Sequence, residues 1–459
     1  MSPGSRPVRA VGWALVGRLF GTDGVRGVAG RELTGELAYS LGAAAVRVLG
    51  AHGGARPTVI VGRDTRASGD FLEAALAAGI CSAGGDVLLA GVQTTPAVAF
   101  LTTSLRANAG AMISASHNPP EYNGIKFFSR DGYKLPDALE DEIEALLDGE
   151  PERSGGVEVG RIAPVPDARE RYVGHLVGAA EAPLSGLRLV VDCANGSAAT
   201  VAPEALRWLG AEVHVIGDQP DGLNINVGVG AMHPEVVAAE VVRLGADAGV
   251  AHDGDADRAL FADAWGNVVD GDQVLAACAL ALRDAGRLAG NTVVTTVMAN
   301  LGFHRCMHDA GIEVRTTKVG DRYVLEEMLR TGAVIGGEQS GHVIFTERAT
   351  TGDGVLTAIV FLSLAAKAGI SVADLAGRMH RFPQILENVR VADLAALDAA
   401  EDVWSAVKAA EVELGDRGRI LVRPSGTEPL VRVMVEAATE EEARTHVDAI
   451  ADVVRRTLA

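Results

Sequence analysis

Five short polar segments carry the residue types that could do chemistry, and the strongest signal is a trio of aspartates at alternate positions. Asp253, Asp255 and Asp257 lie in a DGDADR segment directly after an apolar run. Three carboxylates this close repel one another unless a cation compensates them, and a set of oxygen ligands suits Mg²⁺ or Ca²⁺. An EF-hand is excluded, because Arg258 and Ala264 stand where that loop needs glycine and glutamate. A solvated acidic turn and an aspartyl-phosphate nucleophile with Asp255 as its acid stay open.

A second segment, SASHNP at residues 114–119, offers serine hydroxyls and a histidine. No GxSxG elbow surrounds Ser116, and His117 is its immediate neighbour, so acyl transfer by a serine and histidine pair is poorly supported. A serine that carries a phosphoryl group needs a divalent metal, cations and a positioned acceptor, which the other segments could supply. The same residues could equally form an N-cap and a turn.

Two later segments have the chemistry of ligand contacts. GEQSGH, at residues 337–342, offers Glu338, Ser340 and His342, which suit the binding of sugar hydroxyls but could simply satisfy backbone groups at a strand end. RPSGTEP, at residues 423–429, combines a guanidinium, hydroxyls and a tight turn. These groups are typical of a phosphate cradle, with a plain hairpin turn as the alternative. The cradle would consist of Arg423, Ser425, Gly426 and Thr427.

Two candidate cations lie nearer the start of the chain. Arg26 belongs to the glycine-rich GTDGVRG segment, and Lys126 follows the serine segment in NGIKFF. Either could stabilise phosphoryl charge, or be an ordinary exposed side chain. A Walker A sequence, a GxGxxG fingerprint and an HExxH motif are missing from the sequence, so the sequence does not support an NTPase, a nucleotide-dependent dehydrogenase or a zinc protease.

Composition narrows the class of partner. The formal charge of −19 opposes attraction to polyanions, so we expect no nucleic acid and no anionic membrane as partner, whereas a small anion stays possible where cations gather. The four cysteines are far apart and read as thiols in a reducing compartment. We also find neither an apolar run long enough to span a bilayer nor a convincing signal peptide, and therefore expect a cytoplasmic protein.

The segments that must position these groups recur three times in the same order. Each repeat reads as βαβαβ, with its most polar loop after the third strand. The predicted strands are residues 58–61, 86–90, 110–113, 187–191, 212–216, 248–251, 292–297, 312–315 and 333–335. Helices are predicted over residues 69–83, with Ser68 as N-cap, and near residues 96, 199–209, 234–244, 301–309 and 321–330. Strands alternating with helices imply parallel sheets covered on both faces, with ligand sites at their carboxyl ends.

The last part of the chain departs from this pattern, because residues 419–422 and 430–435 read as a hairpin followed by a helix over residues 440–455. We therefore expect an α/β protein of three related mixed α/β domains plus a smaller C-terminal α+β domain. The predicted boundaries are residues 17–166, 167–271, 272–382 and 383–459.

Together, GTDGVRG, SASHNP with NGIKFF, DGDADR, GEQSGH and RPSGTEP resemble the α-D-phosphohexomutase superfamily, from about Gly17 to the C-terminus. TKVGDRYV at residues 317–324 and TTGDG at residues 350–354 favour the branch that acts on glucosamine phosphates. The implied reaction interconverts glucosamine 6-phosphate and glucosamine 1-phosphate, on the route to UDP-N-acetylglucosamine. Mannose or glucose phosphates are the alternative substrates, and an aspartyl phosphatase using Asp253 is the alternative of another class.

The resemblance also implies roles for individual residues. Ser116 would be the phosphoserine, and its phosphate with Asp253, Asp255 and Asp257 would hold Mg²⁺. Glu338 and Ser340 would bind sugar hydroxyls, and the 423–427 segment would bind the distal phosphate. Lys126 and His342, ahead of Arg26, would act as general acid or base or stabilise charge.

Further implications concern cofactors and the start of the chain. The resemblance implies a sugar bisphosphate, of glucosamine or glucose, as intermediate and activator, and a kinase or self-phosphorylation to load Ser116.

Residues 1–16 have no counterpart in the resemblance, so we expect either a misassigned start, with Val16 encoded by the true start codon, or a disordered tail. The segment Pro120-Glu121-Tyr122 departs from the usual pattern before NG, which leaves the local loop geometry open.

Overall fold

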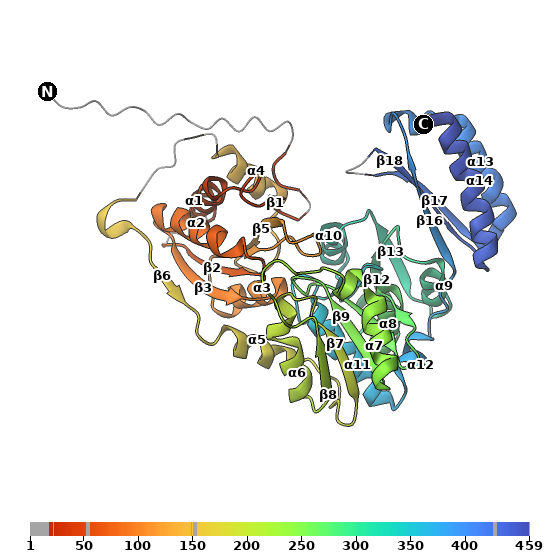
Figure 1. The fold of residues 1–459 in the computed structure, drawn as a ribbon, viewed down its shortest axis with the longest axis horizontal. Coiled ribbons are helices and arrows are strands. Elements are labelled where there is room, and N and C mark those ends of the chain that lie inside the picture. Colours follow the sequence, from red (N-terminus) through yellow and green to blue (C-terminus); the bar gives the residue numbers. More distant parts are fainter. Residues whose placement is uncertain are drawn as a thin grey trace.

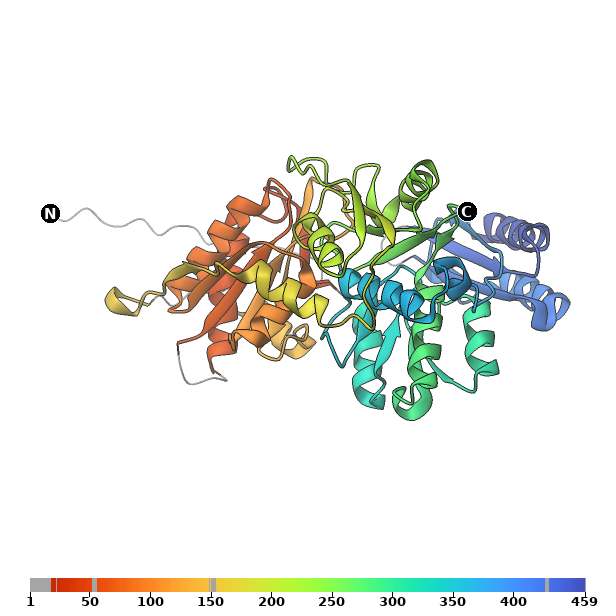
Figure 2. The same cartoon turned by 90° about the horizontal axis from the view of Figure 1, so that it is seen from below.

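Four sheets follow one another along the chain in the computed structural model, which describes residues 18–21, 23–51, 56–147, 149, 154–425 and 429–458. Figures 1 and 2 show the first sheet at one end of the molecule, the fourth at the other, and the second and third between them. The predicted α/β architecture of four domains is confirmed, and each domain is centred on one sheet. The exact boundaries stay predictions, and the expected extension over residues 1–16 lies outside the described residues.

Domain 1 contains a six-stranded sheet in the order β1-β5-β4-β2-β3-β6. Alternate residues of its central strand enter different cores, since Val59 and Val61 pack with α1 and α2 whereas Ile60 packs with α3. Helices therefore cover both faces of the sheet. The elements are β1 (Val25–Val28), α1 (Gly35–Ala51), β2 (Thr58–Arg63), α2 (Gly69–Ser82), β3 (Asp86–Val92), α3 (Thr95–Ser104), β4 (Ala109–Ile113), β5 (Tyr122–Ser129), α4 (Asp137–Ala145) and β6 (Ile162–Pro164).

Domain 2 contains a five-stranded sheet in the order β11-β10-β9-β7-β8. Val190 packs with α7 on one face, and its neighbours Leu189 and Val191 join the large core on the other face. The elements are α5 (Ala168–Val177), β7 (Arg188–Asp192), α6 (Ala202–Trp208), β8 (Glu212–Ile216), α7 (Pro234–Leu244), β9 (Ala248–His252), β10 (Ala259–Asp263) and β11 (Val268–Val269).

Domain 3 contains a four-stranded sheet in the order β13-β12-β14-β15. Its helix α11 is buried along most of its length, and the large core that contains it also includes strands of domain 2. The elements are α8 (Gly271–Asp284), β12 (Thr292–Thr296), α9 (Leu301–Asp309), β13 (Glu313–Thr317), α10 (Asp321–Thr331), β14 (Ile335–Gly337), β15 (Val343–Phe345), α11 (Gly354–Ala368) and α12 (Val372–Ala376).

Domain 4 is a three-stranded antiparallel sheet in the order β16-β18-β17, packed against two helices. The predicted hairpin and C-terminal helix are both confirmed. The elements are β16 (Gln384–Arg390), α13 (Glu401–Leu414), β17 (Arg419–Pro424), β18 (Leu430–Glu436) and α14 (Glu440–Leu458).

The sheets of the first three domains are mixed and not parallel throughout, and each departs from the expected parallel arrangement at the same place. After each polar loop the chain turns back into a strand that pairs antiparallel with the one before it: β4 with β5, β9 with β10, and β14 with β15. The fourth polar loop also joins antiparallel strands, β17 and β18. All four candidate loops are therefore hairpin connections, which pins both ends of each loop to a sheet.

One smaller prediction also fails. Ser68 precedes α2 but has helical backbone angles, and its side chain makes no cap. Its Oγ accepts instead from Asn123 Nδ2 at 2.9 Å, which ties α2 to β5. Within the described ranges, no helix is both long and apolar enough to cross a membrane.

Candidate functional site

The serine loop and the aspartate loop meet between domains 1 and 2. Ser116 is buried, with a backbone φ of +50°, and its Oγ donates to Asp253 Oδ2 at 2.6 Å. A left-handed backbone is costly for a residue with a Cβ, so the surroundings must hold it. Burial, followed by the charges of Arg258 and Arg26, lowers the pKa of the adjacent His117 to about 4. Ser116 is therefore aimed at the carboxylates beside a neutral histidine.

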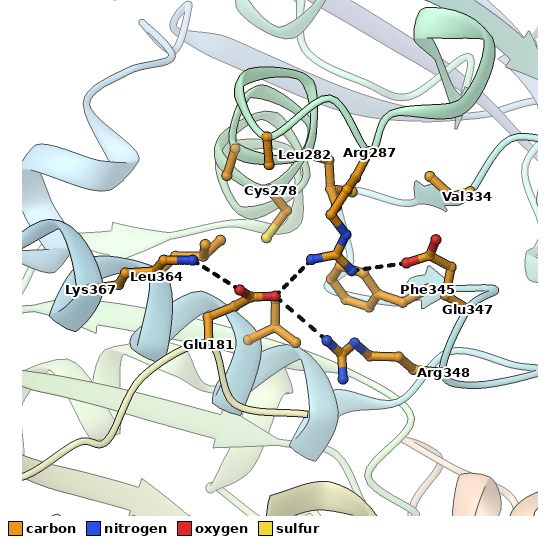
Figure 3. A pocket seen from close by; sticks show the side chains of 13 residues that line it. Glu181, Cys278, Leu282, Arg287, Val334, Phe345, Glu347, Arg348, Leu364 and Lys367 are labelled. Atoms are coloured by element: carbon orange, nitrogen blue, oxygen red, sulfur yellow. Dashed lines mark hydrogen bonds and ion pairs between the residues drawn. The ribbon is translucent and has the colours of Figure 1, made fainter. Parts of the chain in front are cut away.

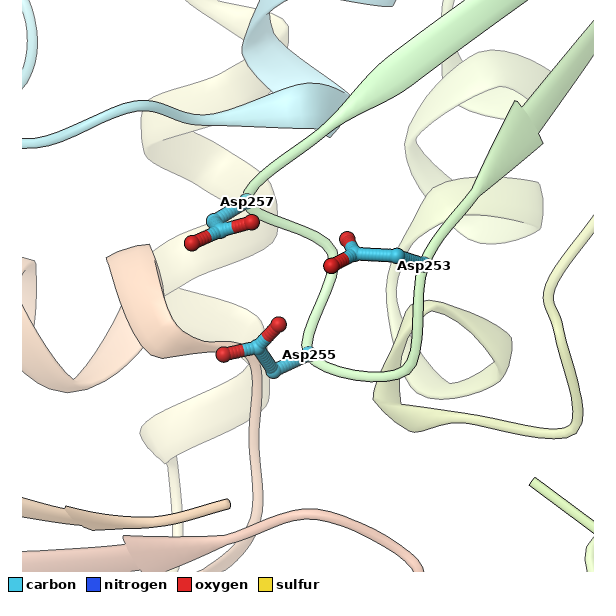
Figure 4. Close-up of side chains that lie close together, drawn as sticks. All are labelled: Asp253, Asp255 and Asp257. Atoms are coloured by element: carbon cyan, nitrogen blue, oxygen red, sulfur yellow. The ribbon is translucent and has the colours of Figure 1, made fainter. Parts of the chain in front are cut away.

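The three aspartates form one buried cluster, and Figure 4 shows their carboxylates turned toward a common space. Each offers an oxygen within 4.8 Å of the others. Burial and the neighbouring carboxylates raise the pKa of Asp253 well above its usual range and that of Asp255 to about 6. Oδ1 of Asp255 and Oδ1 of Asp257 are buried without a hydrogen-bond partner among the described residues. An oxygen-liganded divalent cation would satisfy both the charges and these oxygens, so the residues fit Mg²⁺.

Domain 1 supports the aspartate loop through the first turn of α3. Thr95 is buried, and its Oγ1 donates to Asp255 Oδ2 at 2.5 Å while its backbone N donates to the Asp255 carbonyl at 3.0 Å. The backbone N of Arg258 donates to Asp253 Oδ1 at 3.2 Å. Two of the three carboxylates are thus oriented by contacts from outside the trio.

His342 lies against the third carboxylate. Its Nδ1 is 3.6 Å from Asp257 Oδ2, and the backbone N–H of Gly352 donates to its Nε2 at 3.2 Å. Burial would lower the pKa of His342, but the charge of Asp257 raises it to about 9. The Gly352 contact opposes that effect, because an N–H can donate only to an unprotonated nitrogen. A neutral ring with its proton on Nδ1 fits both contacts, and His342 then orients Asp257.

Lys126 and Arg26 share a second charged cluster at the contact of domains 1 and 3. Lys126 Nζ lies 3.3 Å from Asp23 Oδ1 and 4.0 Å from Asp321 Oδ2, and Arg26 NH1 lies 3.5 Å from Asp23 Oδ2. Burial alone would lower the pKa of Lys126, but the two carboxylates raise it above its usual value. Lys126 is therefore positively charged and is held in place by two carboxylates.

The loop of domain 3 presents a carboxylate and a hydroxyl. Glu338 Oε1 accepts from the backbone N of Gly320 at 3.0 Å, and this contact joins the loop to the start of α10. Ser340 Oγ is buried without a hydrogen-bond partner in the part of the chain that the structure describes. An unpartnered hydroxyl beside a carboxylate is suited to a polyhydroxylated ligand.

The loop of domain 4 stands apart from the other three. Arg423 lies opposite Arg432 in the hairpin, and Arg432 NH2 lies 3.4 Å from Ser425 Oγ, to which it donates. Burial and the charge of Arg432 lower the pKa of Arg423. Gly426 and Thr427 lie outside the described residues. Among residues 18–425 and 429–458, leaving aside the gaps already named, no hydrogen bond or ion pair joins Arg423 or Ser425 to the aspartates.

Sequence reasoning missed three residues that the fold brings to the site. Arg66 and Asn226 both donate to the Ser116 carbonyl at 2.9 Å, and Thr95 holds Asp255. Arg66 and Thr95 lie in polar segments just after parallel strands, a signal that could have found them. Asn226 lies in a loop with no such signal.

A pocket away from these loops is lined by α8, α11 and β15 (Figure 3). Glu181 lies at its centre and pairs with Arg287, Arg348 and Lys367. Its cavity of about 60 Å³ is far below the roughly 300–1,000 Å³ of small-molecule sites. Glu181 is paired with all three cations and Glu347 with Arg287, so these contacts join domains 2 and 3, and we assign no ligand to this pocket.

Comparison with family models assigns the fold and site to a known class. The phosphoglucomutase/phosphomannomutase models match in order: domain I at residues 17–154, domain II at 170–266, domain III at 270–382 and the C-terminal domain at 386–453. The chain belongs to this family of phosphohexomutases.

Individual relatives are similar over nearly their whole length. The chain is 57% identical to the phosphoglucosamine mutase of Saccharopolyspora erythraea, covering 95% of this chain and 99% of that protein. It is 54% identical to the phosphoglucosamine mutase of Symbiobacterium thermophilum, covering 96% and 99%. Among solved structures, a phosphoglucomutase/phosphomannomutase family protein from Burkholderia thailandensis matches with a TM-score of 0.82 at 26% identity, covering 96% and 97% of the two chains.

Proposed function

We propose that this chain is an intramolecular phosphotransferase that interconverts glucosamine 6-phosphate and glucosamine 1-phosphate. The observation that carries the proposal is the 2.6 Å hydrogen bond from Ser116 Oγ to Asp253, which brings the serine of one domain onto the buried acidic cluster of the next. Full-length relatives with more than half of their residues identical, all called phosphoglucosamine mutase, support this substrate among the hexose phosphates.

In the proposed reaction, Ser116 carries the phosphoryl group. A free hydroxyl of the sugar phosphate attacks the phosphorus, the bond from phosphorus to Ser116 Oγ breaks, and a sugar bisphosphate forms. After the bisphosphate turns, Ser116 Oγ attacks its other phosphate and releases the isomer. A bisphosphate of glucosamine or glucose, or a kinase or self-phosphorylation, would load the serine at the start.

The residues of the site divide this work. Asp253, Asp255 and Asp257, with the phosphoryl group on Ser116, would hold Mg²⁺, which when bound neutralises charge on the transferring group. Lys126 is charged and would stabilise or protonate the sugar oxygen, with Arg26 beside it. His342 would keep Asp257 in place.

Substrate contacts come from the last two loops. Glu338 and Ser340 would bind sugar hydroxyls, and Arg423, Ser425, Gly426 and Thr427 would bind the distal phosphate. We also propose that residues 17–166, 167–271, 272–382 and 383–459 are the four domains.

The test is a substrate panel combined with phosphate mapping. With a bisphosphate activator present, kcat/KM should be highest for glucosamine phosphates; a preference for mannose or glucose phosphates would replace the substrate. Phosphate should map to Ser116, and Ser116→Ala should abolish turnover, whereas Ser405→Ala on the exposed face of α13 should not. Label on Asp253 and none on Ser116 would show an aspartyl phosphatase instead.

A further inference from the structure

Arg66 is fully buried and uses every N–H of its guanidinium within the protein. Nε donates to Asp64 Oδ2 at 2.9 Å, and the remaining four N–H groups donate to backbone carbonyls of the serine loop. These acceptors are the carbonyls of Ser116 at 2.9 Å, Asn118 at 2.7 Å, Tyr122 at 3.0 Å and Pro119. Because an arginine has five N–H donors, none is left for a substrate.

Asn226 reaches the same loop from domain 2. Its Nδ2 donates to the carbonyls of Ser116 at 2.9 Å and Asn118 at 3.2 Å, which are two of the carbonyls that Arg66 also binds. Asn226 is buried and has a φ of +62°, a conformation that asparagine tolerates better than most residues. Two domains therefore hold the same two peptide groups.

The other side of the Ser116 backbone is held as well. The Ser116 N–H donates to Ser114 Oγ at 2.9 Å, and that hydroxyl donates to Asp64 Oδ2 at 2.6 Å, the oxygen that also binds Arg66. Gly254 of the aspartate loop packs on the far side, where a Cβ would lie 2.7 Å from the Ser116 carbonyl oxygen. A side chain at position 254 would therefore not fit against the serine loop.

Other contacts already join domains 1 and 2 without Arg66 and Asn226. Thr65 Oγ1 donates to the Asn195 carbonyl at 2.6 Å, and the Ala67 N–H donates to the Gly222 carbonyl at 2.9 Å, so neighbours of Arg66 already join domains 1 and 2. The hydrogen bonds that Arg66 and Asn226 donate to backbone carbonyls all reach the serine loop, where Ser116 has an unfavourable positive φ. Such a conformation persists only when its surroundings determine it.

We propose that Arg66 and Asn226 are positioning residues that hold Ser116 at the acidic cluster in both states of the reaction cycle. The inference rests on the proposed function, in which Ser116 gains and loses a phosphoryl group. Both residues bind backbone carbonyls and not the Ser116 hydroxyl, so phosphorylation of that hydroxyl leaves their acceptors in place. The loop can then stay fixed while the bisphosphate turns.

Two variants and a matched control test this role. Asn226→Gly removes the donor and adopts the positive φ without strain. Arg66→Lys keeps a cation beside Asp64 but lacks the planar fork that reaches four carbonyls. The control is Thr65→Val, which removes a contact between the same two domains that does not touch the serine loop. Each is compared with the wild type for kcat, KM, melting temperature and the ³¹P spectrum of the phosphoserine.

Both variants should lower kcat by about 10–100-fold, as small misplacements of reacting groups do, while KM stays within about threefold. Their ³¹P resonance should shift or broaden, and Thr65→Val should match the wild type in both readouts. Folded variants with wild-type kcat and ³¹P spectra would overturn the inference, as would an equal loss in Thr65→Val. A wild type without phosphate on Ser116 would instead reject the proposed function itself.

Discussion

Replacing Thr95 with valine tests whether domain 1 helps to build the cation site of domain 2. The two side chains have nearly the same shape, and Thr95 is buried, so the main change is loss of the 2.5 Å hydrogen bond from Oγ1 to Asp255 Oδ2. Hydrogen bonds to charged groups contribute about 1.5–3 kcal/mol. That range corresponds to roughly 10–150-fold in an equilibrium constant, since 1.4 kcal/mol is a factor of ten.

The assay is mutase activity as a function of Mg²⁺ concentration. We expect the half-saturating Mg²⁺ concentration of Thr95→Val to rise by about 10–100-fold, which is typical when a residue that orients a metal ligand is lost. The matched control is Thr102→Val in the same helix, because Thr102 is equally buried but donates to the Val98 carbonyl. An unchanged Mg²⁺ dependence in Thr95→Val, or an equal change in Thr102→Val, would refute the reasoning.

Two other substitutions test buried groups of domain 1. Burial, with the charge of Asp137, raises the pKa of Glu140 to about 7 against the charges of Lys134, Arg18 and Arg322. The protonated form of Glu140 therefore stabilises the folded state, fully at pH values below the usual pKa of 4.5, and this contribution to the free energy of unfolding is lost as the pH rises through about 7. Because of Glu140, the free energy of unfolding of the wild type should fall by roughly 3 kcal/mol between about pH 5 and pH 8, and Glu140→Gln should remove this fall. Denaturant unfolding at several pH values measures both proteins, and an unchanged pH dependence in the variant would contradict the reasoning. Gly79→Ala would place a Cβ 2.0 Å from the Tyr39 carbonyl oxygen between α1 and α2. Thermal unfolding should show a loss of about 1–3 kcal/mol, whereas Gly174→Ala, at an exposed position of α5 with open space around it, should be neutral or stabilising. Equal melting temperatures for the two alanine variants would contradict this packing argument.

Local patterns in the sequence determined the repeats and most of the candidate groups. The three aspartates stand at alternate positions of one loop, so their closeness follows from chain spacing alone. The pattern of apolar residues predicted the strands and helices of the three repeats. It did so because helices cover both faces of each of these sheets, so strands and helices alike bury apolar residues at regular positions. The strands after the polar loops, such as β5 and β10, were missed because their antiparallel pairing depends on partners elsewhere in the sheet.

Only the tertiary structure decided which groups meet. Arg66, Thr95 and Asn226 come from separate segments of two domains, and no spacing in the sequence predicts that Arg66 and Asn226 bind the Ser116 carbonyl or that Thr95 binds Asp255. The contacts of His342 with Asp257 and Gly352 likewise depend on how two loops pack. The sequence sets residue types and local spacing, whereas contacts between distant segments depend on how the sheets and domains pack in three dimensions. The types of reactive group could therefore be predicted from single loops, but the positions of these groups relative to one another could not.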